Sequence, residues 1–266
     1  MNSKITAESF WADVQKVRES APLVHNITNY VVMNNTANAL LAAGASPVMA
    51  HAPEEVEEMV AIASALVINI GTLNQDWVAA MKLAMAAAAK KGIPIIFDPV
   101  GSGATSYRTQ TCLDLLTIGA NVIRGNASEI MSLVDASIQT KGVDSGADVS
   151  LAEQAALNLA KHYSCVVVVS GAIDLVTDGN KKFFIPHGAA LMSKVTGLGC
   201  TATALIGAFS AINRDYCTAA AHAMSFMGIC GEIAAKGAIG PASLQLNLID
   251  TFYNIDQAQI AAHLRD

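Results

Sequence analysis

The chain has 266 residues, of which 53% are hydrophobic and 14% are charged, and its formal net charge is −6 at pH 7. This acidic balance argues against a nucleic-acid-binding surface, and no apolar run reaches the roughly 18 residues that span a membrane. The five cysteines are odd in number and form no CxxC pair, so they predict neither a disulfide framework nor a zinc site.

The first 36 residues combine a helix with an unusual polar stretch. An amphipathic helix is predicted at 7–20, without the apolar core of a signal peptide, so we expect a cytoplasmic protein. The next segment, HNITNYVVMNN (25–35), places a histidine and four asparagines among apolar residues. Asn26 and its neighbours could bind a ligand hydroxyl or ring nitrogen, and they could equally cap a helix or form a turn.

From residue 38 to residue 170 the sequence alternates between helices and short apolar strands. Gly44 and Gly92 end two of the helices, and Asn74 caps the start of the second. We predict strands at 46–49, 65–70, 93–97, 120–123 and 165–169. We predict helices at 38–43, 53–63, 74–91, 107–118, from 126 onward and at 151–162, with a polar, mobile loop at 135–148. Apolar strands without alternation, separated by helices, indicate a mostly parallel sheet covered on both faces.

Several polar residues lie at or just beyond the ends of these predicted strands. They are Thr72, Asp98, Arg124, Asn126 and Ser170. Ligands of a parallel sheet bind beyond the carboxyl ends of its strands. A buried sheet gives no structural reason for polar groups at this edge, so their shared placement predicts a binding site there.

After Gly171 the pattern changes. Strands predicted at 173–177 and 182–186, joined through Asp178-Gly179-Asn180, form an antiparallel hairpin. The C-terminal part is predicted to be helical, at 201–212, 216–236, 241–254 and 256–264. No linker divides the chain, so we expect a single α/β domain over residues 1–266.

The loop TGLGC (196–200), before the first of these C-terminal helices, is a candidate anion site. Gly197 and Gly199 allow a tight turn and leave backbone N–H groups uncovered. The helix start adds unsatisfied N–H groups and the positive end of its dipole. Phosphate is the anion that such helix starts commonly bind. The glycines could also serve close packing alone.

A phosphate-binding loop, an arginine and carboxylates on one rim are typical of magnesium-assisted phosphoryl transfer. Asp98 is a candidate ligand of magnesium or of its water, and Glu129 is another. Each carboxylate taken alone could also be an ordinary cap or a surface charge. The high apolar fraction further indicates surface buried between subunits.

Three other interpretations remain open from the residues. The run GLGCTA (197–202) satisfies GxGxxA, which would indicate a nicotinamide-dependent oxidoreductase, but it follows a hairpin and lacks the acidic residue that would bind a ribose. Cys200 could be a nucleophile with His25, His51, His187 or His222 as its partner, or it could simply fill a tight turn. The small-residue-rich helices would also suit a non-enzymatic assembly subunit.

Six segments spread over nearly the whole chain carry a family resemblance. They are HNITNYVVMN (25–34), GASPVMAHAPEE (44–55), FDPVGSGA (97–104), IRGNASEI (123–130), VSGAID (169–174) and VTGLGC (195–200). With them the chain resembles the hydroxyethylthiazole kinase family of the ribokinase-like superfamily. The resemblance implies one ribokinase-like domain that uses ATP and Mg²⁺ to phosphorylate the hydroxyl of 4-methyl-5-(2-hydroxyethyl)thiazole in thiamine salvage. It also implies a homotrimer with its sites between subunits.

The resemblance implies roles for individual residues as well. Its ATP contacts would be Arg124, Asn126, Ser170 and Thr196, the last close to the phosphates. Asp98 and Glu129, the latter in an NxxE pattern, would manage the metal.

The thiazole would contact Asn26, Met49 and Gly197, and the backbone N–H groups from Gly197 through Gly199 to Cys200 would hold the transferring phosphoryl group. Cys200 stands where the wider superfamily usually has an aspartate base. The identity of the base is therefore left open.

Overall fold

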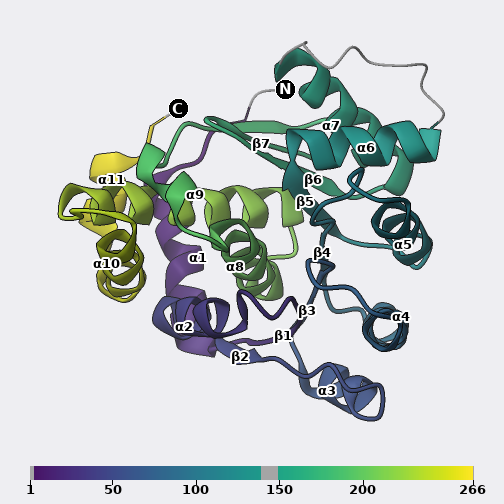
Figure 1. Ribbon diagram of the computed structural model, residues 1–266. Coiled ribbons are helices and arrows are strands. Elements are labelled where there is room, and N and C mark those ends of the chain that lie inside the picture. Colours follow the sequence, from purple (N-terminus) through teal and green to yellow (C-terminus); the bar gives the residue numbers. More distant parts are fainter. Residues whose placement is uncertain (1–2, 139–148, 266) are drawn as a thin grey trace.

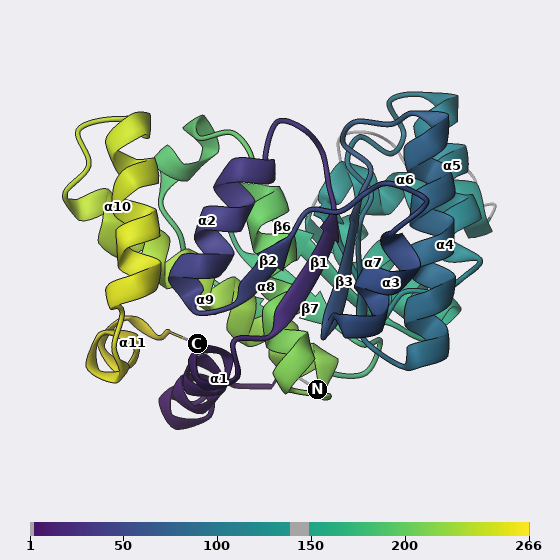
Figure 2. The same cartoon turned by 90° about the horizontal axis from the view of Figure 1, so that it is seen from below.

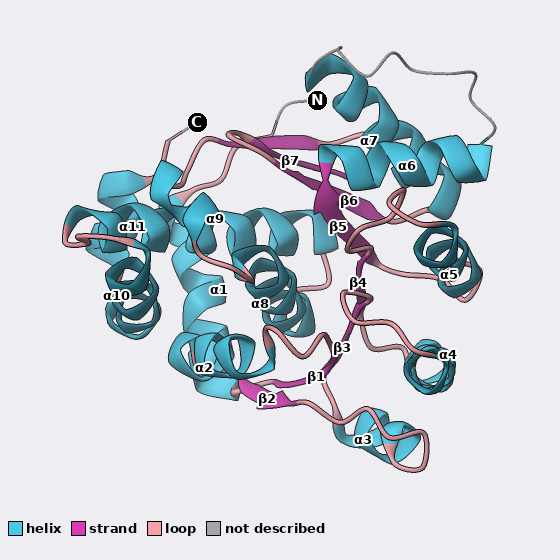
Figure 3. Cartoon of the chain, viewed as in Figure 1, coloured by secondary structure: helices cyan, strands magenta, loops and turns pink. Residues whose placement is uncertain are grey.

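The computed structural model describes residues 3–138 and 149–265, and its centre is a single sheet (Figure 1; Figure 3). Its strands are β1 (Leu23–Ile27), β2 (Ser46–Val48), β3 (Ala65–Asn69), β4 (Ile95–Asp98), β5 (Val122–Asn126), β6 (Val166–Ser170), β7 (Asp174–Thr177) and β8 (Lys182–Ile185). They lie in the order β2-β1-β3-β4-β5-β6-β7-β8. The strands from β2 to β6 are parallel, and β7 and β8 add an antiparallel hairpin.

Helices cover both faces of this sheet, as Figure 2 shows from below. One layer contains α1 (Ala7–Ser20), α2 (Met33–Ala43), α8 (Leu198–Ile212), α9 (Tyr216–Lys236), α10 (Pro241–Asn254) and α11 (Gln257–His263). The other contains α3 (Val56–Ile62), α4 (Gln75–Lys91), α5 (Ser106–Leu116), α6 (Ala127–Ile138) and α7 (Val149–Tyr163). The predicted α/β class, with a mostly parallel sheet and a helical C-terminal part, is therefore confirmed.

Successive residues of one strand serve two different cores. In β3, Ala65 and Val67 pack in the core beneath α8, whereas Leu66 and Ile68 pack in the core beneath α4. Side chains of a strand alternate between its faces, so a strand that is covered on both sides must be apolar at every position. This explains the continuous apolar runs in the sequence.

Helix α8 is deeply buried, with its residues from Thr201 to Ser210 all buried. Its small residues allow close contact with the sheet. A Cβ added at Gly207 would lie 2.9 Å from Val67 Cγ2 and 3.2 Å from Val24 Cγ1. The helix therefore crosses the middle of the sheet and brings its N-terminus to the carboxyl edge of the strands.

Local capping explains why several boundaries could be predicted. The predicted bounds of α1, α9 and α10 are those observed. The Asn74 side chain accepts a hydrogen bond from Trp77 N, which confirms the predicted cap of α4, and Gly44 and Gly92 end α2 and α4 with positive φ angles. Over the described residues, no helix is both long and apolar enough to cross a membrane.

Some predicted elements were wrong or missing. Strand β1 was not predicted, because His25 and Asn26 interrupt its apolar run. The 3₁₀ helix η1 (Ala190–Lys194) was not predicted either. The loop predicted from residue 135 is helical as far as 138, where α6 ends, and residues 139–148 lie outside the described part of the chain. Strands β4 and β5 each begin later than predicted and extend further at their carboxyl ends, where they include Asp98 and Asn126.

Candidate functional site

The N-terminus of α8 forms one side of the candidate site. Gly197 precedes the helix with φ 81° and ψ 0°, a left-handed conformation that favours glycine. A Cβ there would also lie 2.5 Å from Val32 Cγ1. The first helical N–H groups, from Leu198 to Cys200, have no acceptor within the helix, and the positive end of the dipole lies among them. This end of α8 is suited to an anion.

Arg124 supplies a fixed positive charge beside this helix end. Its Nη2 donates a hydrogen bond to Ser170 Oγ at 2.5 Å, and its Nη1 lies 4.0 Å from Asp98 Oδ2. A Cβ added at Gly199 would lie 2.6 Å from Arg124 Nη1, so glycine is required for the guanidinium to rest on the first turn of α8. Strands β4, β5 and β6 thus bring their polar ends against one helix N-terminus.

Asp98 lies at the centre of a buried hydrogen-bond network. Its Oδ2 accepts from Thr203 Oγ1 at 2.7 Å and from Asn69 Nδ2 at 2.8 Å. Asn69 Oδ1 in turn accepts from Asn29 Nδ2 at 2.9 Å. The side chain is fully buried, and burial raises the pKa of Asp98 to about 6 although Arg124 opposes the shift. Oδ1 is buried without a hydrogen-bond partner among the described groups.

Cys200 lies beside this network. Asn29 Nδ2 is 3.5 Å from its Sγ. Burial, followed by the nearby Asp98 carboxylate, raises the pKa of the Cys200 thiol to about 11. The thiol is therefore protonated at neutral pH despite its place at a helix N-terminus.

The histidines considered as partners of Cys200 have other contacts. His25 is bonded to Ala50 O at 2.8 Å, and His222 to Asp13 Oδ2 at 2.8 Å. His51 packs on Trp77, with the ring centroids 4.5 Å apart.

Glu129 and Asn126 form a capping box at the start of α6. Asn126 Oδ1 accepts from Glu129 N at 2.9 Å, and Glu129 Oε2 accepts from Asn126 N at 2.8 Å. Glu129 Oε1 also accepts from Gly101 N at 2.8 Å, which ties the loop after β4 to the first turn of α6. Both carboxylate oxygens thus have structural hydrogen bonds, which leave further lone pairs for a ligand.

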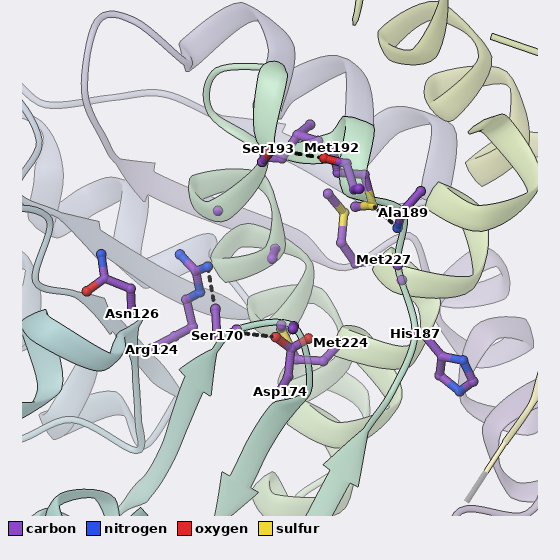
Figure 4. Close-up of a pocket in the computed structure, with 18 residues that line it drawn as sticks. Arg124, Asn126, Ser170, Asp174, His187, Ala189, Met192, Ser193, Met224 and Met227 are labelled. Carbon is purple, nitrogen blue, oxygen red and sulfur yellow. Dashed lines mark hydrogen bonds between the residues drawn. The ribbon is translucent and has the colours of Figure 1, made fainter. Parts of the chain in front are cut away.

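A pocket of about 850 Å³ opens beside Arg124 (Figure 4). Arg124, Asn126 and Ser170 line one side of it, and Leu198 and Gly199 bring in the start of α8. The opposite side comes from the segment after β8 and from α9, and its lining residues are His187, Gly188, Ala189, Ala190, Met192, Ser193, Met224, Met227 and Gly228. The pocket combines a cationic end with a mostly apolar end, as a nucleotide would require.

The structure places the other predicted site residues outside this pocket. Thr196 is exposed in the turn before α8, and Gly197 lies next to it. Met49 is half-buried just after β2, at the far edge of the sheet. Asn26 is fully buried in β1, where its Nδ2 donates to Val24 O at 2.9 Å. Within one chain, Asn26 and Met49 are not brought to Arg124.

Sequence reasoning missed several residues of the site. Asn69 ends an apolar strand as Asp98 does, and that shared position was an available signal. Nothing in the sequence distinguishes Thr203 from the other small residues of α8. Its role follows from a hydrogen bond to Asp98, which lies 105 positions away in the chain. Asp174, whose pKa burial raises to about 6, lines the pocket and accepts from Gly171 N at 2.9 Å.

Two structural observations bear on the cofactors considered from the sequence. The GxGxxA run follows the 3₁₀ helix η1, so the strand that should precede a nicotinamide-nucleotide loop is missing. Among residues 3–138 and 149–265, no group of three or more His, Cys, Asp or Glu side chains could hold a metal by itself. Magnesium usually needs only one or two carboxylates together with substrate phosphates.

Comparisons with known proteins agree with this geometry. Residues 14–258 match the family model described as the Hydroxyethylthiazole kinase family. A hydroxyethylthiazole kinase of Syntrophus aciditrophicus is 54% identical over 264 residues, which cover 98% of each chain. The solved structure of a hydroxyethylthiazole kinase protein from Pyrococcus horikoshii has a TM-score of 0.91 at 42% identity and covers 97% of this chain and 98% of that one.

A more distant structure supports the fold. A ribokinase-like superfamily protein of Enterococcus faecalis has a TM-score of 0.66 at 13% identity, over 94% of this chain and 95% of that chain. The predicted ribokinase-like fold is therefore confirmed, and nothing supports the oxidoreductase alternative. With the family model spanning most of its length and a relative more than half identical, the chain belongs to the hydroxyethylthiazole kinase family.

Proposed function

We propose that this protein transfers the γ-phosphoryl group of ATP to the hydroxyl of 4-methyl-5-(2-hydroxyethyl)thiazole, a salvage step toward thiamine diphosphate. The observation that carries the proposal is the position of Arg124, between Ser170, Asp98 and Gly199 at the start of α8. A guanidinium fixed on a helix N-terminus beside an 850 Å³ pocket is suited to a triphosphate. Membership in the hydroxyethylthiazole kinase family indicates the class of the phosphoryl acceptor, a thiazole alcohol.

ATP would lie in the pocket with its phosphates toward Arg124 and its base toward the apolar side. Asn126 and Ser170, which line the pocket, would flank the phosphate end. Thr196, exposed in the turn before α8, would lie close to the phosphates. The N–H groups of Gly197, Gly199 and Cys200 would stabilise the charge on the transferring group. Because these donors are already in place, they need no reorganisation during the reaction.

The residues present also fit Mg²⁺. Asp98 Oδ1 is a buried carboxylate oxygen without a hydrogen-bond partner among the described groups, and Glu129 is close enough to raise the pKa of Asp98 further. Asp98 and Glu129 would therefore hold the ion, directly or through its waters. When bound, Mg²⁺ neutralises charge on the phosphate oxygens. Thr203 and Asn69 fix the orientation of Asp98 by occupying its other oxygen.

Asn26, Met49 and Gly197 are the residues we propose for the thiazole. Asn26 and Met49 lie apart from the pocket in one chain, which suits a homotrimer whose sites are completed between subunits. We further propose a single kinase domain over residues 1–266 and a cytoplasmic location. Exposed apolar side chains such as Tyr30 and Val31, 60% and 69% exposed, support burial of this region against another subunit.

The direct test is ADP release measured with the thiazole alcohol, with and without Mg²⁺. We expect ADP only when ATP, Mg²⁺ and the thiazole alcohol are all present, and the phosphate ester should be detectable by mass spectrometry. Two controls are omission of the acceptor and its replacement by pyridoxal. ADP release that does not depend on the thiazole alcohol, or that prefers pyridoxal, would contradict the proposal.

A further inference from the structure

One side of the nucleotide pocket is made by a single connecting segment, residues 186–193, which we call the wall segment. It leads from β8 toward the glycine turn before α8. Six of the residues that line the pocket belong to it, namely His187, Gly188, Ala189, Ala190, Met192 and Ser193. Figure 4 shows His187, Ala189 and Met192 on the side of the pocket opposite Arg124. The position of this segment therefore decides the width of the pocket.

Helix α9 holds the wall segment from behind. A Cβ added at Gly228 would lie 2.5 Å from His187 Cβ, and one added at Gly231 would overlap Met192 Sδ. Glu232, four residues after Gly228 and thus on the same face of the helix, accepts a hydrogen bond from Gly188 N at 3.0 Å. Its side chain is 13% exposed, so this contact is partly shielded from water.

Arg265 completes the attachment from the segment after α11. Its guanidinium pairs with Glu232 Oε1 and donates to Pro186 O at 2.7 Å. Its backbone N lies 3.5 Å from His187 Nε2. Burial alone would raise the pKa of Glu232, but the hydrogen bonds from Gly188 and Arg265 outweigh burial and lower it. Three consecutive residues, 186 to 188, are thus held by one carboxylate and one arginine.

We propose that Glu232 and Arg265 are positioning residues for the nucleotide, which raise the affinity for ATP without touching it. Neither residue lines the pocket. A wall segment that is already ordered spares ATP the conformational cost of ordering it. Arg124 and the first turn of α8 make none of these contacts, so we expect the chemical step to be unaffected. The proposal rests on the ATP-dependent activity proposed above.

The test compares steady-state kinetics of Arg265→Ala, Glu232→Ala, Glu232→Gln and Arg265→Lys with the unmodified protein. In both alanine variants we expect the KM for ATP to rise about five- to thirty-fold, as for lost hydrogen bonds to a charged group. The kcat and the KM for the thiazole alcohol should stay within about two-fold. Arg265→Lys should show a smaller rise than Arg265→Ala, because an ammonium group can still pair with Glu232. Glu232→Gln should likewise be milder than Glu232→Ala, because the amide oxygen can still accept from Gly188 N.

Lys236→Ala is the matched control. Lys236 Nζ lies 2.9 Å from His263 Nε2, so it joins the same end of α9 to α11 rather than to the wall segment. We expect its KM for ATP to be unchanged. Calorimetric titration with ADP should show the same loss of affinity in Arg265→Ala as the kinetics do.

Two results would overturn the positioning role. One is a KM for ATP in Arg265→Ala that equals that of the unmodified protein, with normal ADP binding in both. The other is a parallel fall of kcat and thermal stability in Arg265→Ala and Lys236→Ala, which would indicate a general structural role. If the unmodified protein itself bound no ADP, the proposed kinase function would fail, and this proposal would fail with it.

Discussion

At the scale of single residues, Asp98 has the most unusual environment of the site. It is fully buried, and burial raises its pKa to about 6 from an ordinary value of 3.8. A carboxyl group whose pKa is higher in the folded state favours folding most when it is protonated. The contribution of Asp98 to the free energy of unfolding therefore falls as pH rises from about 4 to about 6. At neutral pH the ionised Asp98 carboxylate therefore destabilises the fold. We attribute its presence at this position to a cation that it can bind.

We predict that Asp98→Asn separates stability from activity. The amide can still accept from Thr203 and Asn69, and it removes a buried charge, so the free energy of unfolding at about pH 8 should be equal to or above that of the unmodified protein. The kcat/KM should fall by at least about a hundredfold, as for loss of an electrostatic contact in the transition state. Urea denaturation and ADP release measure the two effects. A variant that is fully active would remove Asp98 from the mechanism.

The pH dependence of the reaction offers a second check on Asp98. Because the ionised carboxylate is required in our account, kcat/KM, which reports the free enzyme, should rise with pH through an apparent pKa of about 6. Asp174 lines the pocket and has a pKa of about 6 as well. Asp174→Asn should keep the acidic limb of the kcat/KM profile, and the residual activity of Asp98→Asn should lose it. The opposite pattern would assign the limb to Asp174.

Cys200 is the residue for which the environment argues most directly against a charged role. With a pKa of about 11, its thiol is almost wholly protonated at neutral pH. We predict that Cys200→Ala keeps measurable kinase activity, with a loss between about tenfold and a thousandfold. Cys200→Asp should remain active, because it places a possible base at the same point. Intact-mass measurement during turnover should find no phospho-cysteine, and finding one would overturn this account.

At the scale of secondary-structure elements, long basic side chains join the ends of helices. Arg18 of α1 donates through Nη2 to three carbonyl groups at the end of α10, those of Phe252, Tyr253 and Ile255, at 3.0–3.2 Å. Its guanidinium also lies 5.5 Å from the ring centroid of Trp11. A cation at a helix C-terminus satisfies its free carbonyls and its dipole. Arg18 thus fastens α10 to α1.

We predict that Arg18→Met lowers the free energy of unfolding by about 1–3 kcal/mol, because it removes a hydrogen-bonded charge from three carbonyl groups. Activity at room temperature should be retained, since Arg18 does not line the pocket beside Arg124. Lys82→Met is the matched control. The ion pair of Lys82 with Asp114 joins two exposed side chains at 3.7 Å, so its loss should cost less than about 1 kcal/mol. Equal effects in the two variants would contradict the role given to Arg18.

At the scale of the whole molecule, several large apolar side chains of the described chain are exposed. They include Leu41 at 59%, Leu246 at 69% and Tyr253 at 71%. Solvent-exposed apolar groups of this size favour association. Following the proposed homotrimer, we predict that light scattering gives three times the mass of one chain. Activity should fall on dilution as the trimer dissociates. A fully active monomer at assay concentration would exclude a site that is completed between subunits.

The sequence alone determined those features that depend on neighbouring residues. Helix α4 is capped by Asn74 at its start and by Gly92 at its end, because capping and left-handed backbone are satisfied within a few positions. Continuous apolar strands implied two covered faces, and polar strand ends implied a site at the carboxyl edge. Family-specific segments further indicated the kinase family, which the comparisons confirmed. The strand β1 was missed, because the polar residues His25 and Asn26, which are buried in the structure, interrupt its apolar sequence pattern.

Only the tertiary structure decided features that depend on distant residues. The Asp98 network joins β3, β4 and α8 across 29 and 105 positions, and the wall segment is held by a residue 79 positions after Pro186. A pKa near 6 for Asp98 or 11 for Cys200 follows from burial, which no local sequence window contains. Local preferences are set by backbone geometry along the chain, whereas desolvation and long-range hydrogen bonds exist only after the elements have packed together.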